Sequence, residues 1–263
     1  MARSGALLAA VAAWTLSLAR GLVFALSGAG AWLLGAPCLR RAYHAWLAGA
    51  VLLGPFLHPY ADPHSMLANP RNFLSRTFTA SAWGWTCILA GGFGLLMSYG
   101  ATGRVLALLC PLARLAVGAG LQQAASATLT LVEELKGPCP VPQAAGSPRA
   151  LLPHSPSPAH PAFLLTYCCL LLAEELAIFR RYLARGCPAS TALRLVFLLG
   201  AVLLGLWNLL LLATAVHGPA PGAQALGAAL ATLVWHLTYR CWYRARWSPG
   251  RPAHCLLPPS PPP

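Results

Sequence analysis

Six mostly apolar segments recur along the 263-residue chain, each close to the length that crosses a bilayer. A spanning helix needs about 20 apolar residues, or fewer where flanking side chains reach back to the interface. The segments are 7–26, 42–57, 83–101, 163–179, 195–216 and 223–239. Only 9% of the residues are charged and the mean hydropathy is +0.62, which a soluble core of this size cannot accommodate. The sequence therefore predicts an all-α integral membrane protein, a single bundle of six transmembrane helices.

The segment 104–135 does not fit this pattern cleanly. It is apolar, but Pro111 and Arg114 interrupt it and its second half is polar. We expect an extra interfacial or partly re-entrant helical segment here. A seventh span is the alternative.

The charge distribution predicts the orientation. The formal net charge of +13 could indicate nucleic-acid binding, but the arginines stand at the ends of apolar segments, which favours topology and lipid headgroups and no nucleic acid. With six spans and a cytosolic N-terminus, Arg180, Arg181, Arg185, Arg194 and the C-terminal arginines lie inside, together with Arg71 and Arg76. Arg40, Arg41, Arg104 and Arg114 then lie outside. Both termini are expected in the cytosol; a cleaved signal peptide at the N-terminus is an alternative.

Two proline-rich stretches lie outside the spans. Residues 137–162 are expected to form a lumenal loop and residues 247–263 a cytosolic tail, both extended because proline removes backbone donors. The chain has no metal-ligand spacing, nucleotide-binding loop or catalytic serine motif. No cofactor and no metal are therefore predicted.

Glu174 and Glu175 are unusual because they follow a long apolar run, FLLTYCCLLLA. Ionisable groups within a span are functional candidates. Arg180 and Arg181 follow within two turns, however, so we expect an ion cluster near the inner boundary, packed against Arg194 or His236, that sets helix depth and packing.

Two histidines, His160 and His217, stand at the expected outer boundary. One precedes the fourth span and the other ends the fifth. Two imidazoles at one membrane face can act on a phosphoanhydride, one as nucleophile and the other as acid, with cations holding the phosphoryl oxygens. Arg40 and Arg41 are the expected phosphate-binding cations. The alternative is a pair of ordinary interfacial histidines.

Several blocks resemble the fat storage-inducing transmembrane (FIT) proteins, most closely their type-1 branch. The resemblance runs colinearly from about Pro37 to Gly250. It is carried by PCLRRAYHAWL, SAWGWTC, FLLTYCCLLLAEE, LRLVFLL, LGLWNLLLL, LTYRCWY and WSPG.

The resemblance implies a multi-pass endoplasmic-reticulum membrane protein with both termini cytosolic. It implies a role in lipid-droplet formation through binding of diacylglycerol and triacylglycerol. The family also resembles lipid phosphate phosphatases, and its other branch acts as a fatty acyl-CoA diphosphatase at a lumenal histidine pair. Aligned without gaps, the two family histidine positions fall on Pro161 and Pro219, so His160 is displaced by one residue and His217 by two.

These features leave two main hypotheses. The first is a non-enzymatic binder of neutral lipids, held in crevices beside small residues such as Gly91, Gly92, Gly94, Gly200 and Gly205. The second is a lumenal acyl-CoA diphosphatase that uses His160 and His217. A transporter is a weaker third class, because no matched pair of broken helices surrounds a midplane site.

Overall fold

The structure is a computed structural model that describes residues 2–60, 81–136, 159–218 and 220–244. All its elements are helical, with no strand among the described residues. The helices are α1 (Ala2–Leu34), α2 (Pro37–Leu57), α3 (Ala82–Thr102), α4 (Leu109–Lys136), α5 (Ala159–Ala184), α6 (Thr191–His217) and α7 (Pro221–Trp235). Short elements are η1 (His58–Tyr60), η3 (Val105–Leu108), the π-helical η4 (His236–Cys241) and η5 (Trp242–Arg244). The predicted proline-rich segments 137–162 and 247–263 lie almost wholly outside the described residues.

Local sequence explains several helix boundaries. Pro37 and Pro221 open α2 and α7, where proline's fixed φ fits the first turn. Ser190 caps α6 by accepting a hydrogen bond from the backbone N–H of Leu193. Gly103 ends α3 with a φ of 63°, a left-handed conformation that favours glycine.

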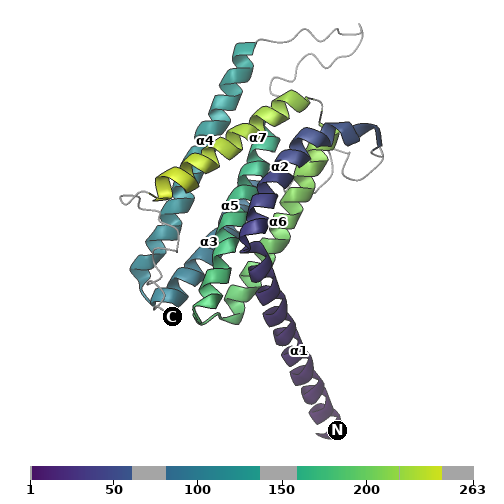
Figure 1. The fold of residues 1–263 in the computed structure, drawn as a ribbon. Coiled ribbons are helices and arrows are strands. Elements are labelled where there is room, and N and C mark those ends of the chain that lie inside the picture. The colour runs from purple at the N-terminus through teal and green to yellow at the C-terminus, as the bar shows by residue number, and fades with distance from the viewer. Residues whose placement is uncertain (1, 61–80, 137–158, 219, 245–263) are drawn as a thin grey trace.

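Helix α5 forms the centre of the bundle (Figure 1). Nearly its whole circumference is buried, because helices α3, α6 and α7 and the last turns of α1 all pack against it. Phe179 contacts Phe93 of α3 and Phe197 of α6, with ring centroids 5.7 and 4.7 Å away. A helix that is apolar on all sides is stable only when it is surrounded by other helices or lipid. Here other helices surround it.

Helix α1 and helix α2 run in the same direction along α6. Ser27 accepts a hydrogen bond from Arg194, at the start of α6, and the ring of His58 lies beside that of His217, at its end. Between them, Gly54 packs against Ala215. The expected reversal between segments 7–26 and 42–57 is therefore wrong: the break around Gly35 joins two helices that continue one path, and α1 extends past the bundle (Figure 1).

The segment 104–135 packs into the structure as η3 and α4. Pro111 and Leu115 of α4 meet Gly94 and Gly91 of α3, so the two helices are antiparallel. Four described stretches are long and apolar enough to cross a membrane: 11–34, 105–132, 159–184 and 191–217. The second of these is the segment expected at the interface, so its length and composition favour the alternative of a span there. These four do not establish a count of six.

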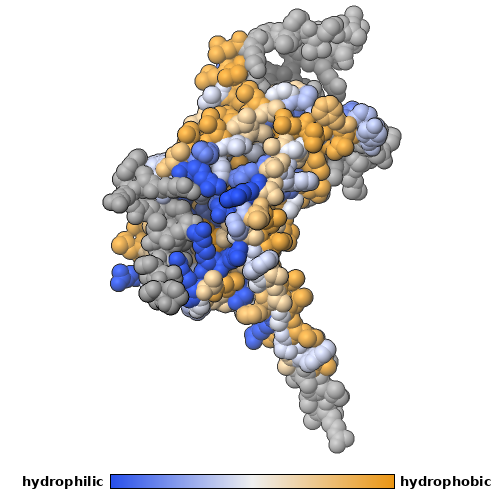
Figure 2. All heavy atoms as spheres, viewed as in Figure 1, coloured by the Kyte–Doolittle hydropathy of each residue, from blue (hydrophilic) through white to orange (hydrophobic). Residues whose placement is uncertain are grey.

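Basic side chains gather at one end of the bundle. Arg180 donates a hydrogen bond to the carbonyl of Gly35, and Arg194 donates one to Ser27. The arginines at this end are Arg40, Arg41, Arg104, Arg180, Arg181, Arg185, Arg194 and Arg240. Figure 2 shows hydrophilic residues concentrated on one part of the visible face, with apolar side chains around them. The expected outer position of Arg40, Arg41 and Arg104 is therefore wrong, because these residues share an end with Arg180.

Candidate functional site

Glu175 belongs to a buried polar cluster between α5, α4 and the C-terminal turns. Its carboxylate lies 2.9 Å from Nη2 of Arg114, and both side chains are 5% exposed. The hydroxyl of Tyr239 donates to Oε1 of Glu175 at 2.9 Å, and the hydroxyl of Tyr243 donates to the carbonyl of Arg114. The expected ion cluster exists, but the partner of Glu175 is neither Arg194 nor His236.

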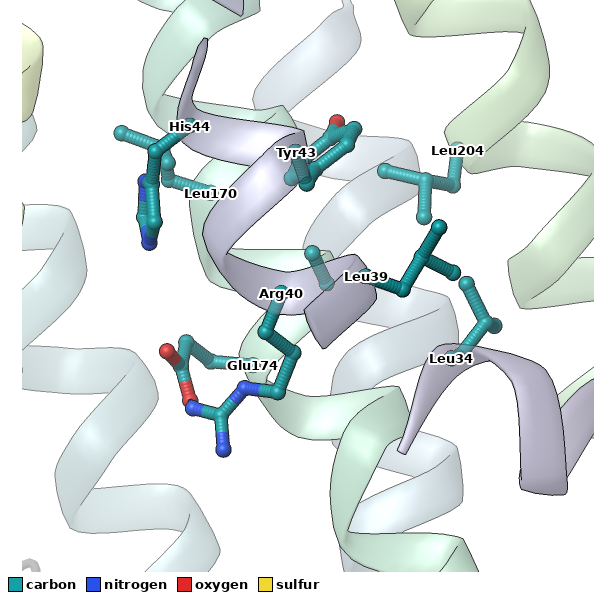
Figure 3. Close-up of a pocket in the computed structure, with 9 residues that line it drawn as sticks. Leu34, Leu39, Arg40, Tyr43, His44, Leu170, Glu174 and Leu204 are labelled. Carbon is teal, nitrogen blue, oxygen red and sulfur yellow. The ribbon is translucent and has the colours of Figure 1, made fainter. Parts of the chain in front are cut away.

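Glu174 points to a different neighbour because adjacent helical residues are about 100° apart. It forms an ion pair with Arg40 of α2, and both side chains remain partly exposed. Figure 3 shows this pair on the side of α2 that also carries His44, one turn further along. These residues, with Tyr43, Leu170 and Leu204, line a small cavity of about 40 Å³.

A larger groove of about 530 Å³ begins where this cavity ends, since His44 and Leu170 line both. Its walls come from α2, α5 and α7. Its apolar lining comprises Leu47, Ala48, Val51, Leu52, Leu170, Ala225, Ala228, Ala229 and Leu233. Leu52 and Leu233 are more than half exposed, so the groove opens on the outer surface of the bundle. Four polar side chains complete the lining: His44, Thr166, Thr232 and His236.

Small residues form this groove, but not those expected. The space beside Gly91, Gly94 and Gly200 is already occupied. Side chains of neighbouring helices fill it: Leu115, Pro111 and Leu176, respectively. Gly92 and Gly205 have open space beside them but line none of the described cavities. The space arises instead where alanines of α7 face α2.

The histidines expected at one membrane face do lie at one end of the bundle. His160 is in the first turn of α5, and His217 ends α6. The ring of His217 lies edge-on to that of His58, with centroids 6.4 Å apart. His58 had no expected partner, because in the predicted arrangement the end of α2 lay on the opposite side of the membrane.

Arg40 and Arg41 are not brought to these histidines. Arg40 pairs with Glu174, which follows His160 by fourteen positions on α5, about 21 Å along the helix axis. Arg41 is exposed beside it. Among the described residues, no group of three or more His, Cys, Asp or Glu could hold a metal ion.

Sequence reasoning missed His44 and Thr166, and it placed His236 beside the acidic pair rather than in the groove. Each sits in a mostly apolar segment, where a single polar side chain gives no indication of a cavity. One signal was available: His44 follows Arg40 by four residues, so both lie on one face of a helix.

The described residues form a helical bundle with helices long and apolar enough to cross a membrane, and with an apolar groove on its outer surface. The chain is 45% identical to fat storage-inducing transmembrane protein 1 of Bos taurus, over 98% of this chain and 92% of that protein. It is 37% identical to the Danio rerio protein of the same name, over 86% and 88%. The chain therefore belongs to the fat storage-inducing transmembrane family, in its type-1 branch.

A more distant relative carries a different name. The Bos taurus protein named acyl-coenzyme A diphosphatase FITM2 is 31% identical, over 84% of this chain and 92% of that protein. No family model matches the chain. No solved structure matches it.

Proposed function

We propose that this protein promotes lipid-droplet formation in the endoplasmic-reticulum membrane by binding diacylglycerol and triacylglycerol and partitioning them. The observation that supports this most directly is the groove between α2, α5 and α7. Its volume of about 530 Å³ lies within the range of small-molecule sites, and its lining is mostly apolar. Because it opens sideways, a ligand can enter from the bilayer without passing through water.

The proposed orientation has both termini in the cytosol. The arginine-rich end of the bundle faces the cytosol because basic residues are retained on that side of a membrane. The end that carries His58, His160 and His217 then faces the lumen. No arginine lies at that end within the described ranges.

Filling the groove tests the binding function. Ala229 lines the groove and is exposed, so Ala229→Trp adds bulk to the cavity without entering the core. We expect binding of glycerides by the purified protein to weaken about tenfold or more, which corresponds to about 1.4 kcal/mol. Fluorescent diacylglycerol and triacylglycerol in detergent provide the measurement.

Leu226→Trp is the matched control. Leu226 is on the same helix and 45% exposed, but it does not line the groove. If Ala229→Trp and Leu226→Trp both bind glycerides as tightly as the unmodified protein, the groove is not the site.

The second candidate function is a lumenal acyl-CoA diphosphatase. The contact between His217 and His58 favours it, as does the place of His160 at the same end. In this proposal His160 and His217 keep their catalytic role, with His58 as a further partner. Arg40 and Arg41 supply no phosphate contact to this pair because they lie at the opposite end.

Product analysis with long-chain acyl-CoA separates the two functions. For a lipid binder, we expect the purified protein and its His217→Ala variant to release product at the same background rate. A positioned acid or base contributes about 10²–10⁴-fold. A loss of that size in His217→Ala, and in either His58→Ala or His160→Ala, would instead establish the diphosphatase.

A further inference from the structure

Thr166 is the polar residue on the inner wall of the groove. It is 2% exposed, and among the described residues its hydroxyl has no hydrogen-bond partner. Several other helical threonines donate to the carbonyl four residues earlier, as Thr128, Thr214 and Thr232 do. Thr166 is an exception to this pattern and also lines the cavity. A buried hydroxyl without a partner is unfavourable, so this wall is suited to a ligand that brings a hydrogen-bonding oxygen.

His44 and His236 lie at the basic end of the same groove. The ring of His44 packs against that of Trp235, with centroids 4.7 Å apart, which restricts its orientation. His236 begins the π-helical turn η4, at the point where α7 stops being a regular helix. Short π-helical turns are frequent at functional sites because they redirect side chains. The groove therefore has one hydroxyl on its inner wall and two imidazoles at its end.

The charges around these imidazoles favour an uncharged ligand. Arg40 is next to this end of the groove, but its charge is paired with Glu174. Arg240 lies over the ring of Trp235, 5.5 Å from its centroid, and does not line the groove. Within the described part of the chain, the lining of the groove contains no arginine, lysine, aspartate or glutamate, so an anionic headgroup would find no fixed countercharge there. A neutral imidazole offers one donor and one acceptor, which together suit a hydroxyl.

On the basis of the proposed lipid-binding function, we propose that the groove recognises the free hydroxyl of a diacylglycerol. His44 and His236 hold this hydroxyl, and Thr166 donates to an ester carbonyl deeper in the groove. The two acyl chains follow the apolar walls and leave through the open side. In triacylglycerol a third ester replaces the hydroxyl, so the ligand no longer has an O–H group that can donate to an imidazole. A third acyl chain must also enter the polar end of the groove. The site therefore prefers diacylglycerol.

A change in the ligand alone tests this preference. The full-length protein is placed in nanodiscs, and binding is measured for dioleoylglycerol, its hydroxyl methyl ether, trioleoylglycerol and dioleoyl phosphatidate. We expect dioleoylglycerol to bind about tenfold more tightly than the methyl ether or trioleoylglycerol, because a site built for a hydroxyl discriminates against analogues that lack it. Phosphatidate is expected to bind more weakly than dioleoylglycerol.

Variants then assign the residues. His44→Phe keeps a ring against Trp235, and we expect this variant and His236→Phe to bind dioleoylglycerol and its methyl ether equally. Thr166→Val keeps the shape of the side chain but removes the hydroxyl. We expect this variant to bind all of the glycerides more weakly. Thr128→Val, on α4 and away from the groove, should change nothing.

The outcomes separate this inference from the proposed function. Equal binding of dioleoylglycerol and its methyl ether by the unmodified protein would overturn the hydroxyl recognition and leave lipid binding intact. Tighter binding of phosphatidate would overturn the assignment to uncharged lipids. Failure of every glyceride to bind would overturn the proposed function itself.

Discussion

Glu175→Gln is expected to lower the free energy of unfolding by about 3–5 kcal/mol, because it leaves the buried guanidinium of Arg114 without a countercharge. Both side chains are 5% exposed, so solvent does not replace the lost partner. Nε and Nη1 of Arg114 have no hydrogen-bond partner within the described ranges, which makes the carboxylate its main compensation. Unfolding of the detergent-solubilised protein by increasing fractions of SDS, followed by tryptophan fluorescence, measures the change.

The neighbouring residue provides the control. Glu174→Gln makes the same chemical change, but the partner of Glu174, Arg40, is 29% exposed. An exposed ion pair contributes about 0–1 kcal/mol, so we expect a small effect. Replacing both members of the buried pair, Arg114→Leu with Glu175→Leu, should restore much of the lost stability. If Glu174→Gln and Glu175→Gln lowered the free energy of unfolding equally, burial would not determine how much each ion pair contributes to stability.

Gly227→Ala is expected to destabilise the packing of α7 on α5 by about 1–3 kcal/mol. A Cβ atom at this position would collide with the backbone carbonyl of Ala159, and it would lie 3.1 Å from the backbone nitrogen of Phe163. Neither atom can move without displacing α5. The same unfolding assay applies, with reduced glyceride binding as a second readout, because α5 and α7 both form walls of the groove.

Gly205→Ala is the matched control for this change. Gly205 is also within a helix, but no atom lies within 4 Å of an added Cβ. Alanine is the better helix former, so we expect an unchanged or slightly raised stability, by about 0.5–1 kcal/mol. If Gly227→Ala is as stable as Gly205→Ala, the close crossing of α5 and α7 is not required.

The helical class and the membrane environment could be predicted from composition and from the length of the apolar segments. These properties depend on each segment alone, so they need no knowledge of neighbours. The acidic pair was also visible, because charged residues are rare within such segments. The structure confirms that every element among the described residues is helical and that ion pairs form at Glu174 and Glu175.

The partners of those residues could not be predicted, because they come from distant parts of the chain. Arg40 and Arg114 precede Glu174 and Glu175 by 134 and 61 positions, respectively, and no local periodicity reports such contacts. The direction of α2 relative to α1 could not be predicted either. An apolar segment, a break and another apolar segment normally indicate a reversal of direction. Whether the chain reverses around Gly35 depends on packing against Arg180 and α6, which hydropathy does not encode.

Glu174 and Glu175 of α5 form ion pairs with two different helices, and these pairs differ in their exposure to solvent. Glu175 pairs with Arg114 of α4 in a buried contact, whereas Glu174 pairs with Arg40 of α2 in a partly exposed one. Helix α2 is held on its other side by α6, where Gly54 packs against Ala215 and Asn208 donates to the hydroxyl of Tyr43. The two adjacent carboxylates therefore contribute to different helix contacts, and loss of the Glu174–Arg40 pair is expected to leave the contact between α5 and α4 intact.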